Sequence, residues 1–156
     1  MGYNNNTTAY GNNRNNRDNR GNYKGQREMQ KKIEAQPLPE DFVDKAEDVF
    51  REKMDVKKIT TSKIRRLFSL LVEIYNKEIL HTADTLSDES LARIQLARIR
   101  MLYEAGRDKD VKCFLEVAKL VEYLKDIGTS RAKLLNYFHY MEALVAYHKF
   151  YGGKEG

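Results

Sequence analysis

Residues 129–151 carry the feature that most limits what this chain can fold into. Read as a helix, the stretch TSRAKLLNYFHYMEALVAYHKFY is apolar over most of its circumference. Leu134, Phe138 and Met141 repeat at helical spacing on one side, and a row of tyrosines repeats along another. A helix that is apolar on all sides must be surrounded by other parts of the chain. We therefore predict a central helix here, with the other elements packed around it.

Amphipathic periodicity predicts four further helices and no strand. They are expected at residues 40–54, 62–80, 88–106 and 108–126. Gly106 and Gly128 are suitable helix stops. Because the loops between the later helices are short, successive helices are expected to pack antiparallel. The sequence thus predicts an all-α fold, a compact five-helix bundle.

The N-terminal segment has a different composition. Residues 1–36 are rich in Asn, Gly and Arg and contain hardly an aliphatic side chain. Such a segment buries too little apolar surface to offset the entropy lost on ordering. We predict a disordered tail at residues 1–36 and a five-helix bundle domain at residues 37–156.

The cysteine content and the hydropathy bear on the compartment. Cys113 is the single cysteine, so a disulfide within the chain is impossible and a reducing compartment is expected. Neither a signal peptide nor an apolar run long enough to cross a bilayer is visible. We predict a cytoplasmic protein with no membrane partner.

Positive charge is concentrated in two parts of the chain. Residues 1–32 carry seven bases and two acids, and residues 56–156 carry 18 bases and 13 acids. Residues 33–55, between them, carry eight acids and three bases. A basic surface is therefore expected on the folded part as well, and this is compatible with a nucleic-acid partner.

Some cations stand where helix electrostatics disfavours them. Lys63, Arg65 and Arg66 crowd the predicted first turn of helix 62–80 with no acid nearby in sequence, and Arg131 and Lys133 begin helix 129–151. Each such cation costs about 0.3–1 kcal/mol, whereas free N–H groups and cations together suit a phosphate. We predict that these five residues contact the phosphates of a nucleic acid. Glutamates at the first three positions are expected to leave the fold equally or more stable.

A second basic row gives an alternative nucleic-acid surface. Arg93, Arg100 and Arg107 recur every seven residues, which places them on nearly one helical face. They could follow a nucleic-acid backbone or simply form a solvated face. Both interpretations remain open from the sequence.

Candidates for catalysis are weak. His81, His139 and His148 lack the spacing of metal ligands. Asp108 and Asp110 stand at a predicted helix start, where capping and the helix dipole account for them. No phosphate-binding glycine loop appears. The sequence predicts no enzyme activity, no catalytic or metal-binding residue and no cofactor.

Three blocks of sequence resemble one protein family. Residues 59–68 (ITTSKIRRLF), 102–108 (LYEAGRD) and 140–151 (YMEALVAYHKFY) are similar to the small helical subunit of the type III-A CRISPR-Cas effector, the Csm complex. The resemblance covers residues 42–153, with the blocks in the same order. It implies a small helical protein present in several copies along a ribonucleoprotein filament, beside the guide RNA and the large subunit.

The resemblance implies a function as well. The protein is expected to be a non-catalytic RNA-binding structural subunit in antiviral defence, which lines the duplex of crRNA and target RNA. Its expected partners are these RNAs, the backbone and large subunits, and further copies of itself. Two alternatives stay open: a helical protein-interaction adaptor without direct RNA contact, and a nuclease that uses Asp108 or Asp110.

Overall fold

The computed structural model describes residues 29–156. Residues 1–28, on which most of the predicted disorder falls, lie outside the described part, so the disordered tail and its boundary stay a prediction. Residues 32–156 form one compact unit. Its first residues have no regular structure but contact the helices: the Gln36 amide donates to the Glu122 carbonyl at 3.1 Å, and Lys125 Nζ donates to the Ile33 carbonyl at 2.6 Å.

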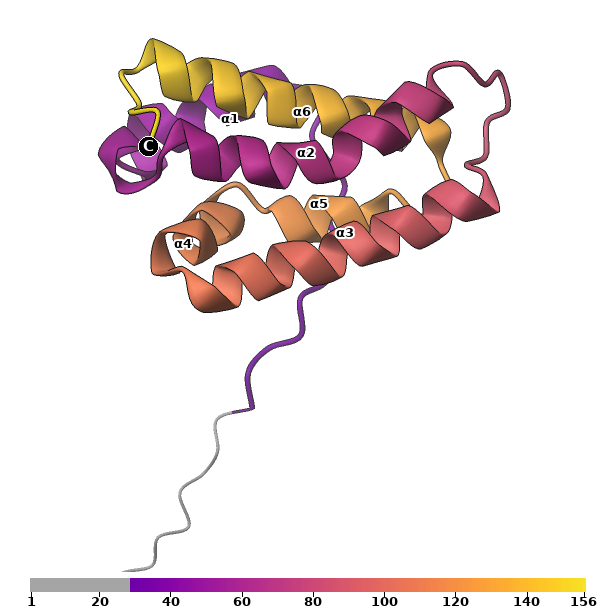
Figure 1. Ribbon diagram of the computed structural model, residues 1–156, viewed down its shortest axis with the longest axis horizontal. Coiled ribbons are helices and arrows are strands. Elements are labelled where there is room, and N and C mark those ends of the chain that lie inside the picture. Colours follow the sequence, from indigo (N-terminus) through magenta and orange to yellow (C-terminus); the bar gives the residue numbers. More distant parts are fainter. Residues whose placement is uncertain (1–28) are drawn as a thin grey trace, which may run out of the picture. The chain divides into compact units, whose positions relative to one another are not determined.

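Helices make up the fold, and the all-α prediction is confirmed. The structure has, within residues 29–156, no strand and the α-helices α1 (Phe42–Asp48), α2 (Thr61–Glu78), α3 (Asp88–Arg107), α4 (Lys109–Val117), α5 (Leu120–Asp126) and α6 (Arg131–Phe150). A π-helix, η1 (Val49–Lys53), extends α1, and a short 3-10 helix, η2 (Val56–Lys58), precedes α2. In the same range, no helix combines the length and the apolar character that a membrane crossing requires. Figure 1 shows α2, α3 and α6 running alongside one another.

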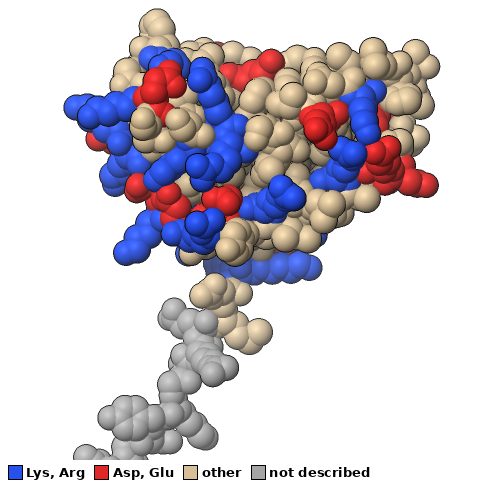
Figure 2. All heavy atoms as spheres, viewed as in Figure 1, with Lys and Arg blue, Asp and Glu red and all other residues tan. Residues whose placement is uncertain are grey.

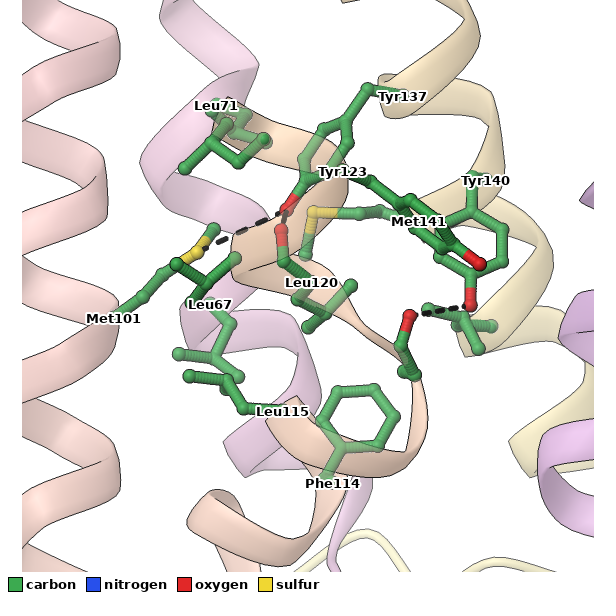
Figure 3. Close-up of a cluster of buried hydrophobic side chains, with 14 of the residues drawn as sticks. Leu67, Leu71, Met101, Phe114, Leu115, Leu120, Tyr123, Tyr137, Tyr140 and Met141 are labelled. Carbon is green, nitrogen blue, oxygen red and sulfur yellow. Dashed lines mark hydrogen bonds between the residues drawn. The ribbon is translucent and has the colours of Figure 1, made fainter. Parts of the chain in front are cut away.

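The predicted helix 108–126 is in fact two helices, so the bundle has six α-helices instead of five. The chain breaks at Lys119, whose φ of 52° is left-handed. Tyrosines of α6 bind the backbone at this break: the hydroxyl of Tyr140 donates to the Ala118 carbonyl and that of Tyr137 to the Leu120 carbonyl, each at 2.8 Å (Figure 3). These bonds connect α6 to the break and give both buried hydroxyls an acceptor.

Helix α6 lies in the core, as predicted. It packs against α1, α2 and α5. Leu134 and Leu144 are fully buried. Tyr137 and Tyr140, from the row of tyrosines, are almost fully buried. Both apolar stripes of the helix therefore face other elements, which is why it is apolar around most of its surface.

The end of α6 is joined to the start of α2 by a buried histidine. His148 Nδ1 lies 3.1 Å from Thr61 Oγ1, and Nε2 lies 2.8 Å from the Ile59 carbonyl and 3.1 Å from that of Val56. Since carbonyls only accept, Nε2 carries a proton. A Cβ at Gly153 would overlap the imidazole ring, so only glycine fits there without rearrangement. This junction fixes the start of α2.

Candidate nucleic-acid interface

The first cation of α2 is bound to the start of α4. Lys63 Nζ lies 2.6 Å from Asp108 Oδ2 and 3.9 Å from Asp110 Oδ2. This hydrogen bond from Lys63 is the main reason that the pKa of Asp108 lies below its usual value. The other oxygen of Asp108 accepts from the backbone N–H groups of Asp110 at 2.9 Å and Val111 at 3.3 Å. Asp108 is thus the N-cap of α4, in the structural role that the sequence indicated.

Arg66 shares a carboxylate with α3. Glu104 lies between two guanidinium groups, with Oε2 3.6 Å from Arg66 Nη1 and Oε1 3.7 Å from Arg107 Nη1. Both distances exceed a hydrogen bond, so the guanidinium donors keep capacity for another acceptor. The Arg107 guanidinium also lies 5.4 Å from the centre of the Tyr103 ring, in a cation–π contact.

Arg65 faces the C-terminal segment. Its Nη1 lies 3.5 Å from Glu155 Oε2, and the other oxygen of Glu155 pairs with Lys149. The hydrogen bond from Lys149 is the main cause of the lowered pKa of Glu155. Beside this pair, the backbone N–H groups of Thr61 and Ser62 donate to the carbonyls of residues 154 and 155.

No acid lies in the first turn of α2, as the sequence indicated, but the fold supplies an acidic partner to each of these cations. Lys63, Arg65 and Arg66 each have a carboxylate from a distant part of the sequence. Their positions in the first turn of α2 are therefore stabilised by tertiary ion pairs. Most of these pairs are well exposed and contribute little each. The helix dipole alone consequently gives no functional signature here.

The two predicted groups of cations lie at opposite ends of α2. Arg131 Nε is 2.5 Å from the carbonyl of Glu78, the last residue of α2, and its Nη1 is 3.5 Å from the Ala83 carbonyl. The Arg131 side chain is only 16% exposed. Lys133 Nζ pairs with Asp126 Oδ2 at 3.1 Å. Since Lys63 and Glu78 are separated by roughly 20 Å of helix, the structure does not bring the two groups into one site.

The alternative row on α3 lies along the seam with α2. Arg93 pairs with Glu73 at 2.8 Å and with Glu89 at 3.1 Å. Arg100 forms no ion pair with any residue in the described range 29–156. It lines two adjoining cavities between α2 and α3, of about 340 and 400 Å³. Arg66 lines the second of these, so α2 and the α3 row meet there.

Further lysines belong to the same end of the molecule. Lys57 and Lys58 of η2 directly precede α2, and Lys109 and Lys112 lie in the first turns of α4. None of the four has an acidic partner within residues 29–156. The sequence interpretation missed the α4 pair, although cations at a helix start were the signal it used, because Asp108 and Asp110 flank Lys109.

We call this cluster the basic end: Lys57, Lys58, Lys63, Arg65, Arg66, Arg107, Lys109 and Lys112. Figure 2 shows Lys and Arg gathered over the end of the molecule where Figure 1 places α4 and the start of α2. The residues come from η2, α2, α3 and α4. No group of three or more His, Cys, Asp or Glu side chains that could hold a metal occurs among residues 29–156.

Comparison with known proteins identifies the family. Residues 36–154 match the family described as Csm2 Type III-A. A CRISPR system protein Csm2 of Mycobacterium tuberculosis is 35% identical over 120 residues, which cover 76% of this chain and 97% of the relative. The Streptococcus thermophilus protein of that name is 38% identical over 120 residues, or 74% of this chain and 95% of the relative. The chain belongs to the type III-A Csm2 family.

The predicted resemblance is therefore confirmed, and the structure shows how its three blocks are related. In this member of the Csm2 family, the first block meets the second through Lys63 and Asp108, and meets the third through Thr61 and His148. The blocks at 59–68, 102–108 and 140–151, separate in sequence, thus converge at the basic end.

Proposed function

We propose that this protein is a non-catalytic structural subunit of a type III-A CRISPR-Cas ribonucleoprotein, and that its basic end contacts RNA phosphates. Several copies would line the duplex of crRNA and target RNA and bridge the backbone and large subunits of a cytoplasmic antiviral complex. Membership of the type III-A Csm2 family supports the role as a subunit. The basic end supports the RNA contact.

One observation carries the RNA assignment. Four lysines lack acidic partners among residues 29–156: Lys57, Lys58, Lys109 and Lys112. The first two lie in η2, directly before α2, and the other two lie in α4, whose start is joined to α2 by the pair of Lys63 and Asp108. No acidic side chain competes with a phosphate group for these lysines. Contacts between lysines and phosphates release counterions, which favours binding. Binding through phosphates does not depend on the RNA sequence. A subunit that lies along a guide RNA of variable sequence requires such binding.

The other predicted residues receive different roles. Arg131 is held by Glu78 and the Ala83 carbonyl, and we propose that it fixes the loop between α2 and α3 without contacting RNA. Lys133 is half exposed but lies at the other end of α2, outside the proposed surface. Asp108 and Asp110 are occupied by capping and by Lys63, so we propose no catalytic role for them.

A double substitution tests the RNA contact without breaking ion pairs. Lys109→Ala together with Lys112→Ala should weaken binding of the purified chain to single-stranded RNA and lower the slope of log K against log salt by about 0.7 for each phosphate that the variant no longer binds. The charge control is Lys45→Ala together with Lys77→Ala, which removes the same charge from α1 and the far end of α2, and with it the exposed ion pairs to Asp41 and Glu89. Equal reductions in affinity for both variants, or none for the first, would contradict the assignment.

A helical adaptor without RNA contact is the second candidate. It is favoured by the ion pairs that already occupy Lys63, Arg65 and Arg66. An adaptor would enter the complex normally when Lys109 and Lys112 are replaced, and the RNA content of the complex would stay unchanged. The proposed RNA subunit would lose RNA retention at moderate salt.

A further inference from the structure

Helix α3 has an apolar outer face in addition to its buried one. Leu96, Ile99, Leu102 and Tyr103 are 57%, 61%, 42% and 62% exposed, respectively. They recur at three- and four-residue spacing, so they form one continuous stripe on the helix. We call this stripe the α3 ridge. Contiguous exposed apolar side chains of this kind mark an interaction surface, whereas single ones do not.

The α3 ridge borders a groove. Leu96 lines the cavity of about 340 Å³ and Tyr103 lines that of about 400 Å³ between α2 and α3. Both cavities share Ser69 and Leu70 of α2, together with Arg100. The ridge thus provides exposed apolar side chains beside a groove in which Leu70 lies among polar residues such as Ser69 and Arg100. Apolar side chains next to polar ones suit an amphipathic helix.

The charge around the ridge selects the partner. Residues 92–107 contain four arginines and one acid, Glu104. Arg100, between the two cavities, lacks an acidic partner in the part of the chain that the structure describes. The complementary partner therefore carries carboxylates beside its apolar stripe.

A symmetric pairing of two copies of this chain through the ridge fits poorly. Two α3 ridges facing each other would bring their arginines together and repel. The acidic segment, residues 33–55, cannot supply the apolar stripe either, because Ala46, Val49 and Phe50 are buried in its own core. RNA fits the aliphatic part of the ridge poorly as well, since Leu96 and Ile99 offer neither a hydrogen-bond donor nor an aromatic face to a nucleotide.

We infer that the α3 ridge and the adjoining groove dock an amphipathic helix from another protein subunit, with its apolar stripe on Leu96, Ile99 and Tyr103 and its carboxylates toward Arg100. This surface adjoins the basic end, because Arg66 lines one of its cavities and Arg107 contacts Tyr103, but Leu96 and Ile99 lie outside the basic end. The inference rests on the proposed function only in that the protein belongs to a complex of several different subunits.

Site-specific crosslinking tests the occupant. A photo-reactive amino acid replaces Ile99 of the full chain in its host, and the same amino acid replaces the exposed Glu142 of α6 as a control. Illumination of the purified complex should attach position 99 to an acidic amphipathic segment of a different protein chain. Attachment to RNA, attachment to a second copy of this chain, or no attachment in a complex that contains the protein would each overturn the inference.

Two single substitutions to serine, one in the ridge and one outside it, add a quantitative test. Ile99→Ser should reduce the partner protein that co-purifies with the chain by about 10-fold, as for a central interface residue. Ile79→Ser removes an equally apolar side chain, 45% exposed, from the end of α2 and should leave the yield of partner unchanged. Both variants should bind RNA as the parent does. Equal partner yields from both variants would refute the docking site, whereas a parent chain that assembles but binds no RNA would refute only the RNA contact.

Discussion

Neutralising Glu104 should strengthen RNA binding at the expense of a little stability. Its carboxylate lies 3.6 Å from Arg66 and 3.7 Å from Arg107, and it is the acid that these two guanidinium groups share. Glu104→Gln keeps the shape and removes the charge. Two arginines at the basic end then become available to phosphates, and one repulsive carboxylate is removed.

The magnitude follows from the exposure of the pairs. The Arg66 and Arg107 side chains are 65% and 62% exposed, so solvent screens both ion pairs. Exposed pairs contribute about 0.2–1 kcal/mol each, and the unfolding free energy should therefore fall by about 1 kcal/mol. RNA affinity at low salt should rise by about 3- to 10-fold, which corresponds to roughly 0.7–1.4 kcal/mol. Each new phosphate contact should steepen the salt slope by about 0.7.

Fluorescence anisotropy of a labelled single-stranded RNA over a salt series measures the affinity, and urea unfolding measures the stability. The control is Glu73→Gln, which makes the same charge change on an exposed carboxylate that pairs with Arg93 away from the basic end. An equal gain in both variants would show that only net charge matters. No gain with Glu104→Gln would remove Arg66 and Arg107 from the RNA surface.

Three further predictions concern the fold that carries the basic end. Met141→Ala, at a position 1% exposed, should lower the unfolding free energy by about 2–5 kcal/mol in urea titrations; a parent-like midpoint would show that α6 is not central. Tyr140→Phe leaves the Ala118 carbonyl without its donor and should cost about 1–3 kcal/mol. Burial raises the pKa of Tyr140, so its contribution is complete below about pH 10, where the unfolded side chain titrates, and declines as the pH rises toward the folded value. Unfolding measured across that range should show a smaller alkaline loss for the phenylalanine variant, and equal losses would contradict this role. Lys63→Glu should destabilise the protein, contrary to the expectation from the sequence, because it places a third carboxylate beside Asp108 and Asp110; an unchanged melting temperature would show that the pair contributes nothing.

Local sequence signals determined most of the secondary structure. Helical periodicity located α2, α3 and α6 and the all-α class, because a repeat of apolar residues depends only on neighbours along the chain. The side chains of Thr60 and Ser87 cap the starts of α2 and α3, a role that depends on residue type and local position alone. Three short blocks were enough to indicate the Csm2 family, since family resemblance depends on residue order alone.

Tertiary contacts decided the rest. No glycine or proline marks the break between α4 and α5 in the sequence. The carbonyls at this break accept hydrogen bonds from the hydroxyls of Tyr137 and Tyr140, which belong to another helix. The acid partners of Lys63 and Arg66 likewise lie at the start of α4 and on α3, far along the chain, where no local pattern connects them. A helix dipole can be inferred from sequence, but the sum of charges around a side chain depends on which surfaces fold together.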